Sequence, residues 1–170
     1  IYIETPANPT MVLVDIQGVV DIAKKHGLKV FVDNTFASPY NTNPLDFGVD
    51  VVIHSLTKYI GGHGDLLGGA VISNDVDFLR QCRLGTLMHF GSVIAPFTAF
   101  LASRGLKTLG VRMRQYNANA LKIARWLENN PKIETVRYPM LESNPLYEIA
   151  KRQMRGGSGM ISFDVAGGLE

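Results

Sequence analysis

Side chains that could do chemistry together occur in three short polar segments, each of which directly follows an apolar run. The polar segments are residues 5–8, 33–35 and 55–58, and the apolar runs before them are residues 1–3, 30–32 and 51–53. If these runs are neighbouring strands of a parallel sheet, the polar segments meet at one of its edges. Ligands of open α/β sheets bind at that carboxyl edge, so we expect a site there.

The combination of an amine, a carboxylate and two hydroxyls in these segments indicates one kind of cofactor chemistry. A lysine at a desolvated site can form a Schiff base with an aldehyde, which makes Lys58 a candidate. A carboxylate such as Asp33 beside a pyridine nitrogen keeps the nitrogen protonated, so that the ring accepts electrons. Ser55 and Thr57 offer hydroxyls to a phosphate and would point the same way in an extended segment. These features predict a site for pyridoxal 5′-phosphate (PLP).

Four longer motifs give this prediction a family context. They are residues 4–9 (ETPANP), 32–35 (VDNT), 54–65 (HSLTKYIGGHGD) and 105–113 (GLKTLGVRM). Together they resemble the Cys/Met-metabolism PLP-dependent enzymes, which include methionine γ-lyase, cystathionine γ-lyase, cystathionine γ-synthase and their sulfhydrylase relatives. The resemblance extends over essentially the whole chain.

The resemblance implies a role for each candidate residue. Lys58 matches the lysine that holds PLP and then moves protons at the α and neighbouring carbons of the substrate. Asp33 matches the partner of the pyridinium nitrogen, and Ser55 and Thr57 match phosphate ligands. Asn8 matches the asparagine near the phenolic oxygen of the cofactor and the substrate carboxylate.

The resemblance also implies a fold and an assembly. We expect an α/β protein of PLP-transferase fold type I, with a mostly parallel sheet flanked by helices and then the start of a smaller α+β C-terminal domain. Residues 1–109 would be the C-terminal part of the large PLP-binding domain. Residues 110–170 would be a long linking helix and the beginning of the small domain. The implied partners are a small-molecule amino-acid substrate and further copies of the chain, in a tetramer of catalytic dimers.

We expect the chain to be an internal piece of a longer protein, because it begins as though inside a strand. Several parts of the family's site have no counterpart in it. These are the glycine-containing phosphate turn, the tyrosine that stacks on the ring, the tyrosine and arginine from a neighbouring subunit, and the arginine for the substrate carboxylate.

Hydrophobic spacing predicts the elements that position these side chains. Strands are expected at 1–4, at 28–32 ending at Asp33, at 50–54 ending at Ser55, and at 70–73, 133–138 and 160–165. Helices are expected from an N-cap at Asp15 to His26, from an N-cap at Asp75 to about Leu84, and at 94–103, 108–129 and 146–154. The apolar face of the long helix would hold Leu109, Met113, Tyr116, Ala120, Ile123, Ala124 and Leu127. Prolines 39 and 44 predict a loop between the second and third strands.

Composition limits the other functions. There are 17 basic and 15 acidic residues, a net charge of +2, with no basic run, so we expect neither a nucleic-acid nor a membrane partner. No apolar stretch reaches the roughly 18 residues of a membrane helix. A single cysteine, Cys82, is typical of a reducing compartment and is expected to be a packed thiol, so the predicted location is cytoplasmic.

Each candidate also has a structural alternative. Lys58 could be a surface lysine, Asp33 a turn cap, and Ser55, Thr57 and Asn8 turn residues. Arg112 and Arg114 of the long helix are interpreted as solvated or interface charges.

Two further patterns argue against other kinds of site. His54, His63 and Asp65 match no zinc spacing, so we expect no metal. The glycines at 61, 62, 64, 68 and 69 follow Lys58 rather than precede a Gly-Lys-Ser/Thr, which excludes a P-loop and favours a tight loop near the lysine.

The sequence leaves several functions open. The leading hypothesis is γ-elimination on a sulfur amino acid, with a slight preference for a methionine γ-lyase from the His63-Gly64-Asp65 motif. The alternatives within the family are cystathionine γ-lyase, cystathionine γ-synthase and O-acyl-homoserine sulfhydrylase. Transamination and β-elimination are other PLP reactions, and a catalytically incomplete piece that serves only assembly is a different class. A Rossmann nucleotide-binding domain is disfavoured because no G-x-G-x-x-G follows the first strand.

Overall fold

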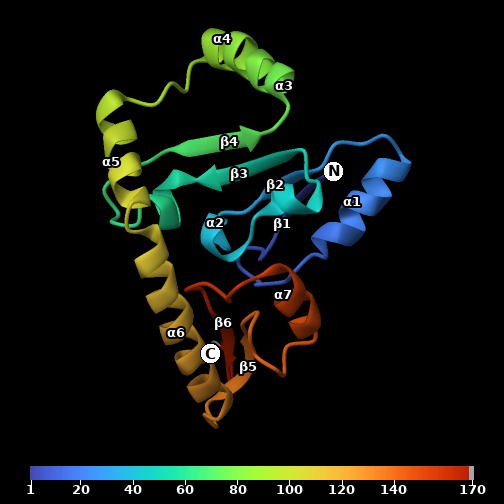
Figure 1. Ribbon diagram of the computed structural model, residues 1–170. Coiled ribbons are helices and arrows are strands. Elements are labelled where there is room, and N and C mark those ends of the chain that lie inside the picture. The colour runs from blue at the N-terminus through green and yellow to red at the C-terminus, as the bar shows by residue number, and fades with distance from the viewer. Residues whose placement is uncertain (169–170) are drawn as a thin grey trace.

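The computed structural model describes residues 1–168, and its centre is a four-stranded sheet (Figure 1). The strands are β1 (Tyr2–Glu4), β2 (Phe31–Asp33), β3 (Val51–Ser55) and β4 (Gly69–Ser73), in the order β1-β2-β3-β4. The first three are parallel and β4 is antiparallel to β3. The predicted mostly parallel sheet flanked by helices is confirmed.

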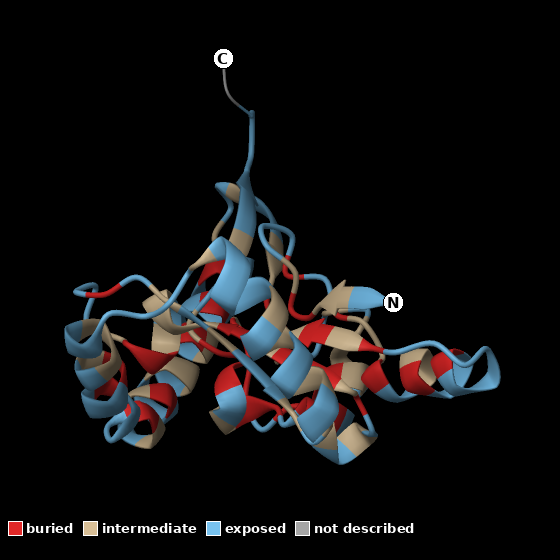
Figure 2. Cartoon of the chain, turned by 90° about the horizontal axis from the view of Figure 1, so that it is seen from above, coloured by how far each residue is buried: buried red, intermediate tan, exposed pale blue. Residues whose placement is uncertain are grey.

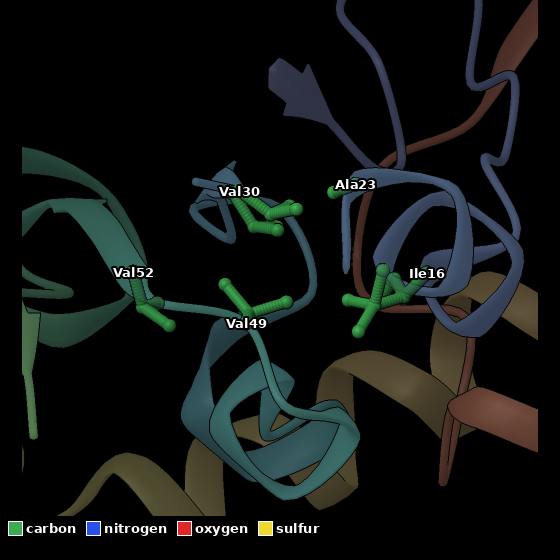
Figure 3. Close-up of a cluster of buried hydrophobic side chains, with 7 residues drawn as sticks. Ile16, Ala23, Val30, Val49 and Val52 are labelled. Carbon is green, nitrogen blue, oxygen red and sulfur yellow. The ribbon is translucent and has the colours of Figure 1, made fainter. Parts of the chain in front are cut away.

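Helix α1 (Ile16–Lys25) covers one face of this sheet. Its N-cap is Asp15, as predicted, because the carboxylate accepts a hydrogen bond of 3.3 Å from the Gly18 N–H. The main core packs the apolar stripe of α1 against the sheet (Figure 3). It consists of Ile16, Val20, Ala23, Val30, Val32, Val49 and Val52. Fully burying one such branched side chain contributes about 1.5–3 kcal/mol.

The stretch between β2 and β3 contains two short helices rather than the predicted loop. They are α2 (Ser38–Asn41) and η1 (Pro44–Phe47), and each has its proline in the first turn. A proline at that position removes an N–H that has no partner within the helix, so it favours a helix start. The predicted loop through Pro39 and Pro44 is therefore wrong where these short helices form.

Helix α3 (Val76–Gln81) begins as predicted, because the N-cap Asp75 accepts a hydrogen bond of 2.9 Å from the Phe78 N–H. The chain stays helical beyond the predicted end at Leu84, through η3 (Cys82–Leu87) and α4 (Met88–Phe90). This helical stretch ends at Gly91, whose φ of 85° is available to glycine at little cost. The single cysteine is half-buried in η3.

Two helices lead from the large sheet to a small one. They are α5 (Pro96–Leu106) and the long α6 (Leu109–Glu128), which runs from the end of α5 to the second sheet (Figure 1). The predicted apolar face of α6 is buried at Leu109, Met113, Ala120, Ala124 and Leu127. Ile123 is 49% exposed, so the prediction that it belongs to the apolar face was wrong.

The C-terminal part is a β–α–β unit that packs back on the first half of the chain. It contains β5 (Ile133–Arg137), α7 (Tyr147–Gln153) and β6 (Ser162–Val165), and the two strands pair antiparallel. The Gln153 side chain accepts a hydrogen bond of 3.2 Å from the Ile16 N–H and donates one of 2.9 Å to the Val14 carbonyl. Buried residues lie toward the interior of the molecule, whereas exposed residues cover much of the outer side of its helices (Figure 2). The division of the chain after residue 109 stays a prediction.

Within residues 1–168, no helix is both long and apolar enough to cross a lipid bilayer.

Candidate functional site

The carboxyl ends of β1, β2 and β3 lie side by side, which confirms that the three polar segments meet at one sheet edge. Glu4 pairs with Asp33, and Asp33 pairs with Ile53. Because side chains alternate along a strand, Ser55 shares the face of Ile53 and therefore of Asp33. The core residues Val32 and Val52 point to the other face, under α1. Asp33 and Ser55 thus share the sheet face that α1 does not cover.

The half-buried Asp33 carboxylate is held by its neighbours. One oxygen, Oδ1, accepts a hydrogen bond of 2.9 Å from the Thr35 N–H, which is a turn contact. The other oxygen, Oδ2, accepts a long one of 3.5 Å from the Tyr2 hydroxyl. Burial, and next the charge of Asp33, raise the pKa of Tyr2. The Thr35 N–H thus fixes Oδ1 of Asp33, while Oδ2 keeps the capacity to accept a hydrogen bond from a further donor.

Thr35 connects the two strands that carry Asp33 and Ser55. Its hydroxyl oxygen accepts a hydrogen bond of 2.8 Å from the Ser55 N–H, and its side chain is buried. The sequence places Thr35 in the motif but gives it no role. The strand-end Asn-Thr pattern alone does not show which strand the hydroxyl reaches.

Lys58 lies in a kinked turn, η2 (Leu56–Ile60), rather than in an extended segment, and its own backbone angles (φ −90°, ψ −122°) are not helical. The turn forms because the Leu56 carbonyl accepts a hydrogen bond of 2.8 Å from the Gly61 N–H. The expectation that Ser55 and Thr57 point the same way in extended chain is therefore wrong. The Thr57 hydroxyl instead bonds the Gly68 backbone, accepting from its N–H at 3.1 Å and donating to its carbonyl at 3.4 Å.

Lys58 and Asn8 are both exposed in this chain. The premise of a desolvated lysine therefore does not hold for the part of the molecule that the structure describes. Asn8 lies in a turn closed by hydrogen bonds of Ala7 with Met11 and Val12. The structure joins Asp33 and Ser55 through Thr35, sets Lys58 on the next turn, and leaves Asn8 on a neighbouring loop.

The glycines after Lys58 form a tight loop, as expected. Gly62 and Gly64 have φ values of 74° and 69°. A Cβ on Gly61 would lie 2.7 Å from the Leu56 carbonyl oxygen and 2.9 Å from the Leu66 side chain. The close approach is thus between this loop and its own turn.

Arg112 is not a solvated charge, which corrects its interpretation from sequence. Its guanidinium donates to the carbonyl oxygens of Tyr59 at 2.6 Å, Ile60 at 3.3 Å and Gly105 at 2.8 Å. Its Nε also donates to the Thr108 hydroxyl at 3.0 Å. The i, i+4 spacing from Thr108 could have predicted only this last contact. Arg114 is exposed.

His54 is buried on the core face of β3. Burial lowers its pKa to about 4, and the charge of Asp33 acts in the opposite direction. The imidazole is therefore neutral near pH 7. Among residues 1–168, no three His, Cys, Asp or Glu side chains are grouped to hold a metal ion.

These side chains fit a phosphorylated pyridine aldehyde as donors and acceptors. The Asp33 Oδ2 can accept a hydrogen bond from a protonated ring nitrogen, and the Lys58 amine is accessible to an aldehyde. The half-buried Ser55 hydroxyl makes no hydrogen bond within residues 1–168, so it can donate to a phosphate. Thr57 fits less well, because Gly68 already uses its hydroxyl.

A carboxylate, a hydroxyl and a lysine at the carboxyl edge of an open α/β sheet define a class of cofactor-binding enzymes. The family model of the Cys/Met metabolism PLP-dependent enzymes matches residues 1–170, and the chain belongs to this family. Its cofactor is pyridoxal 5′-phosphate, and its homologues are lyases and synthases.

Relatives of different activity are about equally similar to the chain. It is 48% identical over 172 residues to the L-methionine gamma-lyase of Porphyromonas gingivalis, a match that covers 100% of this chain and 43% of that protein. It is 49% identical over 169 residues to the cystathionine gamma-synthase of Mycobacterium leprae, covering 99% and 43%. The chain thus spans less than half the length of these relatives.

The fold agrees with solved structures of the same family. The cystathionine gamma synthase of Xanthomonas oryzae pv. oryzae, solved in complex with cystathionine, superposes with a TM-score of 0.95 at 43% identity. The match covers 98% of this chain and 43% of that one. The expected PLP-transferase fold is therefore confirmed.

Proposed function

We propose that this chain is part of an enzyme that eliminates the γ substituent of a sulfur amino acid, as a methionine γ-lyase does. The products would be a thiol, a 2-oxo acid and ammonia. The observation that carries the proposal is the hydrogen-bonded connection of Asp33 through Thr35 to Ser55, one turn before Lys58. The His63-Gly64-Asp65 motif favours elimination, and the Porphyromonas gingivalis relative shows that the family includes this activity.

Bound PLP supplies an aldehyde carbon for an amine and a ring that accepts an electron pair. In this chain, Lys58 would hold the aldehyde and then, as a free amine, accept the proton from the substrate α carbon. The Asp33 Oδ2 would accept a hydrogen bond from the ring nitrogen while Thr35 fixes Oδ1. Ser55 would donate to the phosphate, and Thr57 would do so only by exchanging its contact with Gly68. Asn8 would approach the substrate carboxylate.

A second candidate is γ-replacement, in which a second nucleophile takes the place of the leaving group. The support is the 49% identity to the Mycobacterium leprae cystathionine gamma-synthase, which matches the identity to methionine γ-lyase. Cystathionine γ-lyase and O-acyl-homoserine sulfhydrylase activities belong to the same set of alternatives.

The assembly and location that we propose are a homotetramer of catalytic dimers in the cytoplasm. Large apolar side chains along α4 and α5 support a covering partner, because Phe90 is 85% and Phe97 is 70% exposed. The single cysteine supports a reducing compartment.

Cofactor trapping tests the proposal. The full-length protein is mixed with PLP, reduced with borohydride, digested and mapped by mass spectrometry. We expect the label at Lys58, its loss in Lys58→Ala and its retention in Lys122→Ala, since Lys122 is exposed on α6. Labelling scattered over other lysines would reject the site, and absence of labelling would favour a piece that serves only assembly.

Product analysis then distinguishes the reactions. Methionine, cystathionine and cysteine are each supplied to the loaded protein, with and without a thiol acceptor. Release of 2-oxo acid from methionine supports elimination, whereas a new thioether formed only with the acceptor supports replacement.

A further inference from the structure

The turn that carries Lys58 is held at its C-terminal end by a side chain from another helix. The Arg112 guanidinium of α6 donates to the carbonyl oxygens of Tyr59 and Ile60, at 2.6 and 3.3 Å. The same group donates to the Gly105 carbonyl at the end of α5, at 2.8 Å. One cation therefore joins the Lys58 turn to α5 and α6.

The chemistry of this contact favours a fixed geometry. The last carbonyls of a helical turn have no partner within the turn and carry partial negative charge. Arginine presents five N–H donors in a rigid planar fork, which a lysine at Arg112 would not reproduce. Hydrogen bonds from a charged donor are also stronger than those between neutral groups.

Two glycines leave the space that the contact needs. A Cβ on Gly105 would lie 2.6 Å from the Ile60 carbonyl oxygen and would also collide with the Gly61 carbonyl. A Cβ on Gly62 would overlap the Arg112 guanidinium. The end of α5 thus packs with its backbone against the backbone of the turn, and the Arg112 side chain from α6 occupies the space beside Gly62.

The side chain of Lys58 has no such support of its own. It is exposed, and within residues 1–168 its amine makes no hydrogen bond or ion pair, while its backbone carbonyl accepts one of 2.8 Å from the Gly62 N–H. The backbone of the turn therefore sets the direction of the Lys58 Cα–Cβ bond, and Arg112 holds the last two carbonyls of that turn.

We propose that Arg112 is a positioning residue for Lys58, because it fixes the backbone of the Lys58 turn against α5 and α6. The inference rests on the proposed function of Lys58. The competing explanation is that Arg112 only adds stability to the fold without affecting the lysine.

The test compares Arg112→Gln and Arg112→Lys with Arg114→Gln in the full-length protein. Arg114 is the matched control, since it lies on the same helix and is exposed. The first readout is hydrogen exchange of the Gly61 and Gly62 amides without PLP. We expect exchange at least about tenfold faster in both Arg112 variants, because the charged contact is lost or reduced.

The second readout is the rate at which Lys58 becomes trapped by limiting PLP and borohydride, per folded molecule, together with the pH midpoint of the visible absorbance. We expect the Arg112→Gln trapping rate to fall about tenfold, the midpoint to move, and Arg112→Lys to be intermediate. Lower unfolding stability with unchanged exchange and trapping would overturn the proposal.

The proposed function of Lys58 and the positioning role of Arg112 can fail separately in these experiments. If the wild-type protein is never labelled at Lys58, the proposed function fails and the role of Arg112 toward a cofactor lysine fails with it. If the wild type is labelled and Arg112→Gln is labelled at the same rate, the proposed function stands and the positioning role is rejected.

Discussion

The Thr35 hydroxyl accepts a hydrogen bond of 2.8 Å from the N–H of Ser55, and thereby ties the end of β2 to the end of β3. The N–H of Thr35 donates to the Asp33 carboxylate at 2.9 Å. Thr35, a single buried residue, therefore holds in place both the Asp33 carboxylate and the backbone that leads to Lys58. Neither contact needs the cofactor, so both can be tested on the unloaded protein.

Thr35→Val should destabilise the protein by about 1–3 kcal/mol, because it keeps the shape and leaves the Ser55 N–H without its acceptor. Urea unfolding measures this change. Thr35→Ser retains the oxygen and should recover most of the loss, whereas Thr135→Val on the exposed side of β5 should change the stability by less than about 0.5 kcal/mol. Equal stability of the two valine variants would show that the Thr35 hydroxyl is dispensable.

Local sequence signals predicted the elements that depend on local physics. The N-caps at Asp15 and Asp75 are observed because a short acidic side chain bonds an N–H two or three residues ahead. The adjacent polar ends of β1 to β3 were predictable because apolar runs separated by a crossover form parallel strands.

Contacts between distant residues were not predictable in this way. Arg112 reaches carbonyls more than fifty residues away, and nothing in its own neighbourhood in sequence indicates that. Thr57 was expected in extended chain, but the turn at Leu56 depends on Gly61 and Gly68, which fix it through their own backbone bonds. The same holds for Thr35, whose motif shows the residue but not the strand that it joins.

Gly105→Ala should be strongly destabilising, by about 1–3 kcal/mol or more, because the new methyl would lie 2.6 Å from the Ile60 carbonyl oxygen. The oxygen belongs to backbone and cannot rotate away. The matched control is Gly85→Ala in η3, where a Cβ has nothing within 4 Å and the change should be neutral or slightly stabilising. Thermal unfolding of both variants checks the prediction, and a Gly105→Ala protein as stable as wild type would contradict the packing.

Asn117→Leu should cost about 2–4 kcal/mol in unfolding stability, since it removes a connection between α6, α2 and the segment after α7. Asn117 and Asn41 exchange two amide hydrogen bonds, of 2.8 and 3.0 Å, and the Asn117 Oδ1 also accepts from the Ser158 N–H at 2.8 Å. The variant leaves these buried groups unpaired. Asn119→Leu on the exposed face of the same helix should have little effect. The denaturant midpoints of Asn117→Leu and Asn119→Leu measure this difference in stability, and equal midpoints would contradict the prediction.

His54 should make the stability of the protein depend on pH between about 4 and 6.5. Burial lowers its pKa to about 4 in the folded chain from 6.5, so in this window the unfolded chain binds a proton that the folded chain does not. Stability should therefore rise with pH through the window and level off above 6.5. The shift corresponds to about 3 kcal/mol.

The measurement is the free energy of urea unfolding at a series of pH values for wild type, His54→Gln and His26→Gln. His54→Gln carries no titrating group at this position, so its profile should be flatter by about 3 kcal/mol over the window. His26 is exposed at the end of α1, and its variant should keep the wild-type slope. If His54→Gln retains the full slope, other groups cause it. A retained slope would then mean that the imidazole is charged, or solvated, in the folded protein, contrary to its burial on β3.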